Sequence, residues 1–155
     1  MKLYCTPEFL AEYTRLTKNN SYSALEVEII SKLCNATAQQ VASVGATTLA
    51  PLGKVLFVKK RLNGSGGFRC YLLTVVVDDE VFLGFVHPKS GTFGGDNVTD
   101  AKKKEVLEQL LAARSNKDLY CVKPDSANPK KLTFIHFSTL LLLKVVPIKK
   151  KNPIV

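Results

Sequence analysis

The chain has 155 residues, and its 22 lysines and arginines outnumber 13 aspartates and glutamates to give a net charge of +9. This length predicts a single domain over residues 1–155, and the positive surplus favours a polyanionic partner such as nucleic acid. The four cysteines are widely spaced, which argues against a metal site. The N-terminus has no signal-like apolar stretch, which argues against a secreted protein. We therefore expect a cytoplasmic protein with no cofactor and no membrane partner.

Residues 6–45 are expected to be mostly helical. Thr6 offers a hydroxyl for an N-cap and is followed by a proline and a glutamate, which favour the first turn of a helix. Ser23 and Glu26 have the spacing of a capping box for a second helix. The run "TAQQVASVG" predicts a short third helix, which Gly45 ends in a left-handed conformation.

The pattern then changes to strands. Apolar, β-branched and aromatic runs predict three strands, over residues 54–60, 68–77 and 81–87. A short acidic turn joins the last two, so they are expected to pair as an antiparallel hairpin. The glycine-rich loop "GSGGFR" lacks the pattern GxxxxGK[ST] and leads into a strand instead of a helix, which excludes a P-loop and a Rossmann dinucleotide site.

A helix is expected over residues 100–114, with Thr99 or Asp100 as its cap and a leucine-rich apolar stripe. We therefore predict an α+β fold in which a small antiparallel sheet packs against the N-terminal helices and against this one helix after the third strand. The sheet and helix core is expected to span residues 52–116.

Residues 120–155 form a C-terminal extension. It contains the most apolar segment of the chain, residues 132–146, which is shorter than a membrane span. This segment predicts a buried strand pair or a core helix, and His136 within it is expected to be structural.

Basic residues surround the glycine loop and the end of the third strand. An antiparallel order brings the start of the second strand beside the end of the third, so Arg69 is expected to neighbour His87 and Lys89. The strand before the loop adds a second basic set, consisting of Lys54, Lys59, Lys60 and Arg61. Such a cluster suits RNA, because cations bind its phosphates and stabilise the charge that develops when a 2′-hydroxyl attacks one.

We therefore expect Arg69, His87 and Lys89 to be catalytic and the second basic set to bind RNA phosphates. His87 has the only side chain there with an unperturbed pKa near neutrality, although a lysine in a cationic cluster is another candidate base. Arg69 fits a transition-state phosphate. Two interpretations in which these residues have no catalytic role stay open. In one, His87 is only a ring at the end of a strand; in the other, Arg69 forms a salt bridge to Asp78 or Asp96.

The run from Gly66-Gly67-Phe68-Arg69 to His87-Pro88-Lys89, followed by the Asn97-Val98-Thr99 cap and a basic helix, resembles the RelE/ParE toxin superfamily. The HigB-like branch is the most similar, and the resemblance covers residues 54–114. It implies the toxin of a type II toxin–antitoxin system, a metal-independent mRNA endonuclease that acts with the ribosome and inhibits translation. It also implies a cognate antitoxin protein that covers the basic cleft.

Two departures from the family pattern leave alternatives open. Loop positions that commonly carry basic residues hold Leu62, Asn63 and Ser65, and His87 stands where tyrosine is frequent. One alternative is a non-catalytic binding protein on the same fold, such as a DNA gyrase inhibitor or an RNA-binding factor. The other is a toxin homologue that has lost its activity.

Overall fold

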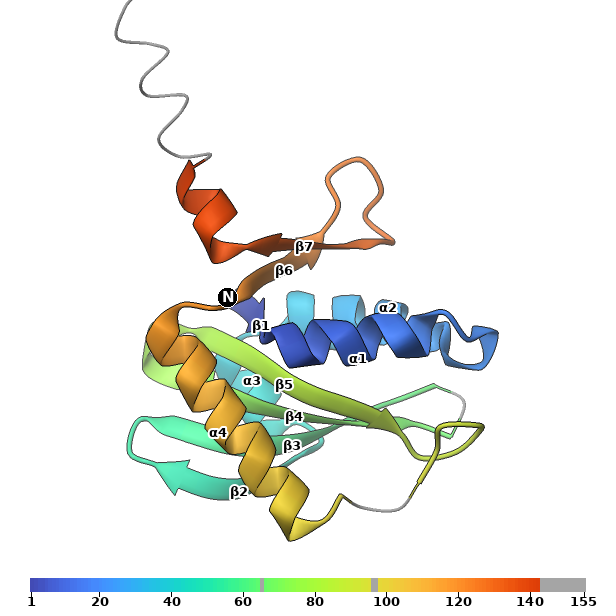
Figure 1. Ribbon diagram of the computed structural model, residues 1–155, viewed down its shortest axis with the longest axis horizontal. Coiled ribbons are helices and arrows are strands. Elements are labelled where there is room, and N and C mark those ends of the chain that lie inside the picture. The colour runs from blue at the N-terminus through green and yellow to red at the C-terminus, as the bar shows by residue number, and fades with distance from the viewer. Residues whose placement is uncertain (65, 96–97, 143–155) are drawn as a thin grey trace, which may run out of the picture.

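The chain has an α+β fold built on one mixed sheet with helices on both faces (Figure 1). The computed structural model describes residues 1–64, 66–95 and 98–142. Within these residues the sheet has seven strands in the order β2-β3-β4-β5-β1-β6-β7. The strands are β1 (Lys2–Cys5), β2 (Ala46–Leu52), β3 (Val55–Leu62), β4 (Phe68–Val75), β5 (Glu80–Pro88), β6 (Tyr120–Pro124) and β7 (Leu132–His136).

The helices form two layers. Those between β1 and β2 are α1 (Pro7–Thr17), the 3-10 turn η1 (Asn20–Tyr22), α2 (Ala24–Ile29), the π-helical turn η2 (Ile30–Cys34) and α3 (Ala38–Ser43). A second 3-10 turn, η3 (Val76–Asp78), joins β4 to β5, and α4 (Asp100–Asn116) follows β5. Helix α4 crosses one face of the sheet, while α1 to α3 lie against the other face (Figure 1).

Helix α1 begins at the Thr6 cap that the sequence predicts, and α3 begins at a capping box that was not predicted. The Thr6 hydroxyl accepts a hydrogen bond from the N–H of Phe9 at 3.1 Å. A full capping box joins Thr37 and Gln40 at the start of α3, because each side chain accepts from the backbone N–H of the other residue. These bonds satisfy N–H groups that have no partner inside the helix.

The predicted capping box at Ser23 is wrong, because Ser23 forms no side-chain cap bond. Glu26 binds elsewhere: its carboxylate accepts from the Tyr13 hydroxyl at 3.1 Å and from the Leu132 N–H at 3.0 Å, and it lies 3.4 Å from the Lys131 ammonium. Glu26 therefore ties the hairpin of β6 and β7 to α1 and α2.

The sheet is larger than predicted and is mixed instead of purely antiparallel. Strands β3, β4 and β5 pair antiparallel as expected. However, β1 pairs parallel to β5 and antiparallel to β6, so it joins the central hairpins to the C-terminal strands. A four-residue strand such as β1 carries too short a pattern to identify from sequence, and β6 lies in a stretch whose prolines suggested a connector.

Strand alternation divides the apolar residues between two cores. Val58 and Phe68 point to the layer of α1 to α3, while Phe57 and Tyr71 point to α4. Helix α4 can pack closely because Gly84 lies beneath it. A Cβ at this position would lie 2.6 Å from a Leu110 methyl carbon, well inside van der Waals contact.

The described part of the apolar C-terminal segment adds strand β7 to the sheet, as expected, but it is neither a buried strand pair nor a core helix. Strand β7 is a half-buried edge strand, and the helical turn after it exposes Leu141 and Leu142. His136 has partners within the fold, with Nε2 2.9 Å from a carboxylate oxygen of Asp118. Residues 143–155 lie outside the described part of the chain. No helix in the described ranges is long and apolar enough to cross a membrane.

Candidate nucleic-acid interface

Three functional candidates lie side by side across β3, β4 and β5. Arg61 pairs with Arg69, and Arg69 pairs in turn with His87. Because directly opposed residues of an antiparallel sheet point to the same face, the two guanidinium groups and the imidazole share the α4 side. The predicted proximity of Arg69 and His87 is therefore confirmed by the strand register.

A cleft of about 480 Å³ opens over these strand ends. It is lined by four basic residues and by the corner between α3 and β2, that is, by Lys59, Arg61, Arg69, Lys89, Ser43, Gly45, Ala46 and Thr47. We call this the basic cleft and its four basic residues the cleft cations. Over the described ranges no carboxylate lines the cleft, and none forms an ion pair with a cleft cation.

The cleft cations repel one another. Burial lowers the pKa of Lys59, and the positive charges of Lys103, Arg69, Lys89 and Arg61 lower it further. Like charges that gather without counter-charges make the empty cleft unfavourable, and a bound polyanion would relieve this repulsion. The predicted alternative of an Arg69 salt bridge to Asp78 is not observed, because the two residues lie at opposite ends of the β4–β5 pair. Asp96 lies outside the described residues.

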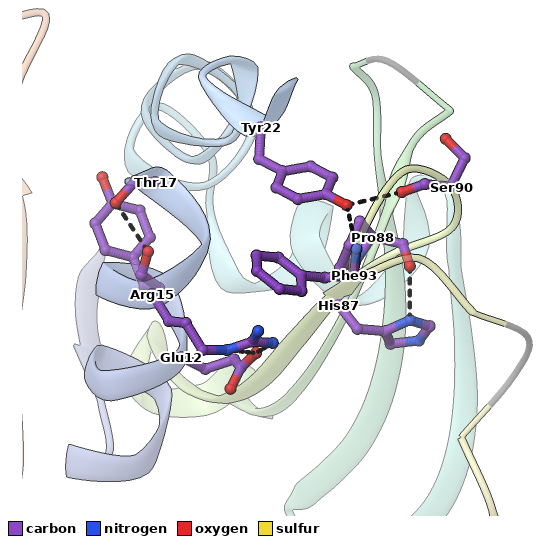
Figure 2. A network of polar contacts seen from close by, with 9 residues as sticks. Glu12, Arg15, Thr17, Tyr22, His87, Pro88, Ser90 and Phe93 are labelled. Atoms are coloured by element: carbon purple, nitrogen blue, oxygen red, sulfur yellow. Dashed lines mark hydrogen bonds and ion pairs between the residues drawn. The ribbon is translucent and has the colours of Figure 1, made fainter. Parts of the chain in front are cut away.

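His87 is held in one protonation pattern. Its ring forms a triangle with the rings of Tyr71 and Phe85, whose centroids lie 6.0 and 6.1 Å away, and only 8% of the residue is exposed. Nδ1 lies 3.1 Å from the carbonyl oxygen of Pro88 (Figure 2). A carbonyl can only accept, so Nδ1 carries the proton in the neutral ring. Nε2 is buried and has no hydrogen-bond partner in the described part of the chain.

The environment also keeps this imidazole uncharged. Burial lowers the pKa of His87, and the nearby positive charges of Lys89, Arg69 and Lys59 lower it further, while the bond to Pro88 acts in the opposite direction. A histidine whose pKa lies below its usual 6.5 is neutral at pH 7. Nε2 then carries the lone pair that a general base requires, although this atom is buried and His87 does not line the basic cleft.

Two predicted members of the basic set do not join the cleft. Alternation along β3 turns Lys60 to the opposite face, where it is 4% exposed and its ammonium donates to the Val44 carbonyl at 2.6 Å. Burial lowers the pKa of Lys60. Lys54 lies in the turn between β2 and β3, at the far end of β3 from Arg61. Their predicted place in the cluster is therefore wrong.

Sequence reasoning missed the corner wall and the contribution of α4. The wall includes Thr47, which pairs with Lys59, and it could not be placed because β2 was not recognised as a strand. Lys103 in the first turn of α4 adds positive potential at Lys59, and Lys102 places its ammonium 4.8 Å from the ring centre of Phe85. Strict alternation along β3 was the available signal, since it separates Lys59 from Lys60.

Comparisons of the chain with protein-family models, with curated proteins and with solved structures found no match. Within the described ranges, no group of three or more His, Cys, Asp or Glu side chains could hold a metal ion. The basic cleft, His87 and the sequence motifs are therefore the features of this chain that bear on its function.

Proposed function

We propose that the protein is an endoribonuclease that cleaves mRNA without a metal ion. The observation that carries this proposal is the cross-strand row of Arg61, Arg69 and His87. In this row a neutral imidazole with an unpartnered Nε2 lies next to Arg69, and Arg61 follows on the next strand. Phosphodiester cleavage by a 2′-hydroxyl needs a base and fixed positive charge within one site, and this row offers both.

In the proposed reaction each group has one role. His87 takes the proton of the 2′-hydroxyl at Nε2, and the resulting oxyanion attacks the adjacent phosphorus. Arg69 binds the phosphorane oxygens, where a planar cation matches the charge that develops. The bond from phosphorus to the 5′-oxygen then breaks, and Lys89 supplies a proton to that oxygen. The products are a 2′,3′-cyclic phosphate and a free 5′-hydroxyl.

The remaining cleft cations, Lys59 and Arg61, bind phosphates on either side of the cleaved bond. Such contacts hold the strand in register but read no sequence. Their lack of carboxylate partners in the described ranges supports this role, because a bound phosphate replaces no existing ion pair.

The resemblance to the RelE/ParE superfamily extends the proposal to a biological role. The protein would be a cytoplasmic toxin of a type II toxin–antitoxin system, acting on messages at the ribosome and inhibiting translation. Its antitoxin would cover the basic cleft, which is a suitable target for an acidic protein segment.

A second candidate is a binding protein without catalysis, such as an RNA-binding factor or a gyrase inhibitor. One observation favours it: His87 is only 8% exposed and does not line the basic cleft. In this reading the imidazole is a buried strand-end ring, and the cleft cations alone engage a polyanion.

The deciding experiment incubates the purified protein with an end-labelled single-stranded RNA in EDTA, alone and in a translating extract. We expect cleavage products with 2′,3′-cyclic phosphate ends, and no cut at a position that carries a 2′-deoxy substitution. Arg69→Ala and His87→Ala should abolish cleavage, whereas Lys54→Ala removes a positive charge outside the cleft and should retain it. RNA binding without cleavage under both conditions would favour the second candidate.

A further inference from the structure

The basic cleft receives one of its cations from an irregular turn. We call residues 88–95 the Lys89 turn; it begins at the end of β5 and folds back toward the helical layer of α1 and η1 (Figure 2). Its internal bond joins the N–H of Gly94 to the carbonyl of Gly91 at 3.0 Å. A turn with so little regular structure needs contacts from outside to hold Lys89 in place.

Tyr22, in η1, provides the central contact. Its hydroxyl accepts from the N–H of Phe93 at 2.7 Å and donates to the carbonyl of Ser90 at 3.1 Å (Figure 2). The ring is fully buried, packs edge-on against Phe68 with centroids 6.1 Å apart, and stacks on Phe93 at 5.9 Å. One side chain thus binds two backbone groups of the turn and is itself fixed by the core.

Helix α1 holds the outer side of the same turn. The guanidinium of Arg15 lies 4.2 Å from the ring centre of Phe93, and Glu12 forms an ion pair with Arg15. Phe93 therefore lies between Tyr22 on one side and Arg15 on the other, although it stays 38% exposed (Figure 2). This places an aromatic ring of the turn against two elements of the helical layer.

The glycine loop holds the inner side. The carbonyl of Gly67 accepts from the N–H of Lys89 at 3.0 Å. A Cβ at Gly66 would lie 1.8 Å from the Ser90 hydroxyl oxygen, and one at Gly91 would lie 2.7 Å from the Tyr22 hydroxyl. The Lys89 turn thus fits between the glycine loop and Tyr22 with no room for added side-chain atoms.

We propose that Tyr22 is a positioning residue for the basic cleft. Its hydroxyl fixes the Lys89 turn through the backbone of Ser90 and Phe93, and so holds Lys89 among the cleft cations beside Arg69. Lys89 does lie in the cleft, and its charge acts on His87. The proposal rests on the proposed function only in taking RNA as the ligand of the cleft.

The test is Tyr22→Phe, which keeps the ring and removes both hydrogen bonds. Because a net hydrogen bond changes an equilibrium by roughly five- to tenfold, we expect the ratio of displaced to positioned turn to rise about tenfold. The value of kcat on RNA should then fall with the positioned fraction, by up to about tenfold. KM should change less, since Lys59, Arg61 and Arg69 are untouched. Exchange of the Phe93 amide hydrogen should accelerate by about the same factor.

Tyr13→Phe is the matched control. Tyr13 is also a buried tyrosine, and its hydroxyl donates to Glu26 at 3.1 Å, away from the cleft. We expect it to lower the melting temperature while kcat stays at the native value. Gly91→Ala is a second probe, because its methyl group would meet the Tyr22 hydroxyl and displace the turn from the other side.

The outcomes separate this proposal from the proposed function. An unchanged kcat in Tyr22→Phe, or an equal loss in Tyr13→Phe, would overturn the positioning role. If the native protein cleaves no RNA, the proposed function fails, and the positioning role is then judged by Phe93 amide exchange and by affinity for a 2′-O-methyl RNA. Faster exchange with weaker binding would support it, and native values of both would refute it.

Discussion

The four cleft cations make a quantitative prediction about salt. Each phosphate contact of a single-stranded nucleic acid lowers the slope of log K against log salt concentration by about 0.7, because binding releases condensed counterions. If Lys59, Arg61, Arg69 and Lys89 each neutralise one phosphate, the slope is about −2.8. Raising the salt concentration fourfold, from about 50 to 200 mM, should then weaken binding roughly fiftyfold.

Single substitutions test this number. Arg61→Ala should change the slope to about −2.1, so that the same fourfold rise in salt weakens binding by only about 18-fold. Lys54→Ala removes the same charge from the far end of β3 and should leave the slope at its native value. Lys60→Met should do the same, since Lys60 is buried on the opposite face and bonded to Val44.

The assay is fluorescence anisotropy of a labelled 2′-O-methyl RNA of about ten nucleotides, which covers the site and resists cleavage. Affinity is measured at several salt concentrations for the native protein, Arg61→Ala and Lys54→Ala. Equal slopes for all three proteins, or an equal reduction in Lys54→Ala and Arg61→Ala, would refute the assignment of the phosphates to the basic cleft.

Because the pKa of His87 lies below 6.5, cleavage should persist at mildly acidic pH and fall only as pH drops through that lowered pKa. Lys89→Met removes a positive charge that lowers the His87 pKa, so NMR of the ring protons should show a higher pKa in this variant. Gly84→Ala should destabilise the fold by about 1–3 kcal/mol in urea unfolding. Combined with Leu110→Ala, which makes room for the added methyl group, the total loss should be smaller than the sum of the two single losses. Glu26→Ala should cost about 2 kcal/mol and increase proteolysis of the β6–β7 hairpin.

Local signals in the sequence identified the central part of the fold. Thr6 and Thr99 cap α1 and α4 as expected, and the acidic turn after β4 correctly predicts the β4–β5 hairpin. That hairpin was sufficient to place Arg69 beside His87. The helix caps and the hairpin were predicted correctly because caps and tight turns are determined by residues only a few positions apart.

Long-range pairing was not accessible in the same way. The parallel contact of Lys2 with Glu80 joins residues on opposite sides of the helical region, and no nearby residue reveals it. The pairing of β6 with β1 depends on that first contact. The orientation of Lys60 was a different kind of error, because the period-two alternation that turns it inward is local and was available in the sequence.

The short strand β1 separates two parts of the sheet whose pairings span different distances along the chain. Strands β3, β4 and β5 follow one another in sequence, so their pairing closes only short loops. The other half depends on β1, which must wait for β5 to be synthesised before β6 and β7 can be added. The row of Arg61, Arg69 and His87 belongs entirely to the early half. A nascent chain could thus assemble the strands of its basic cleft before the remainder of the sheet exists.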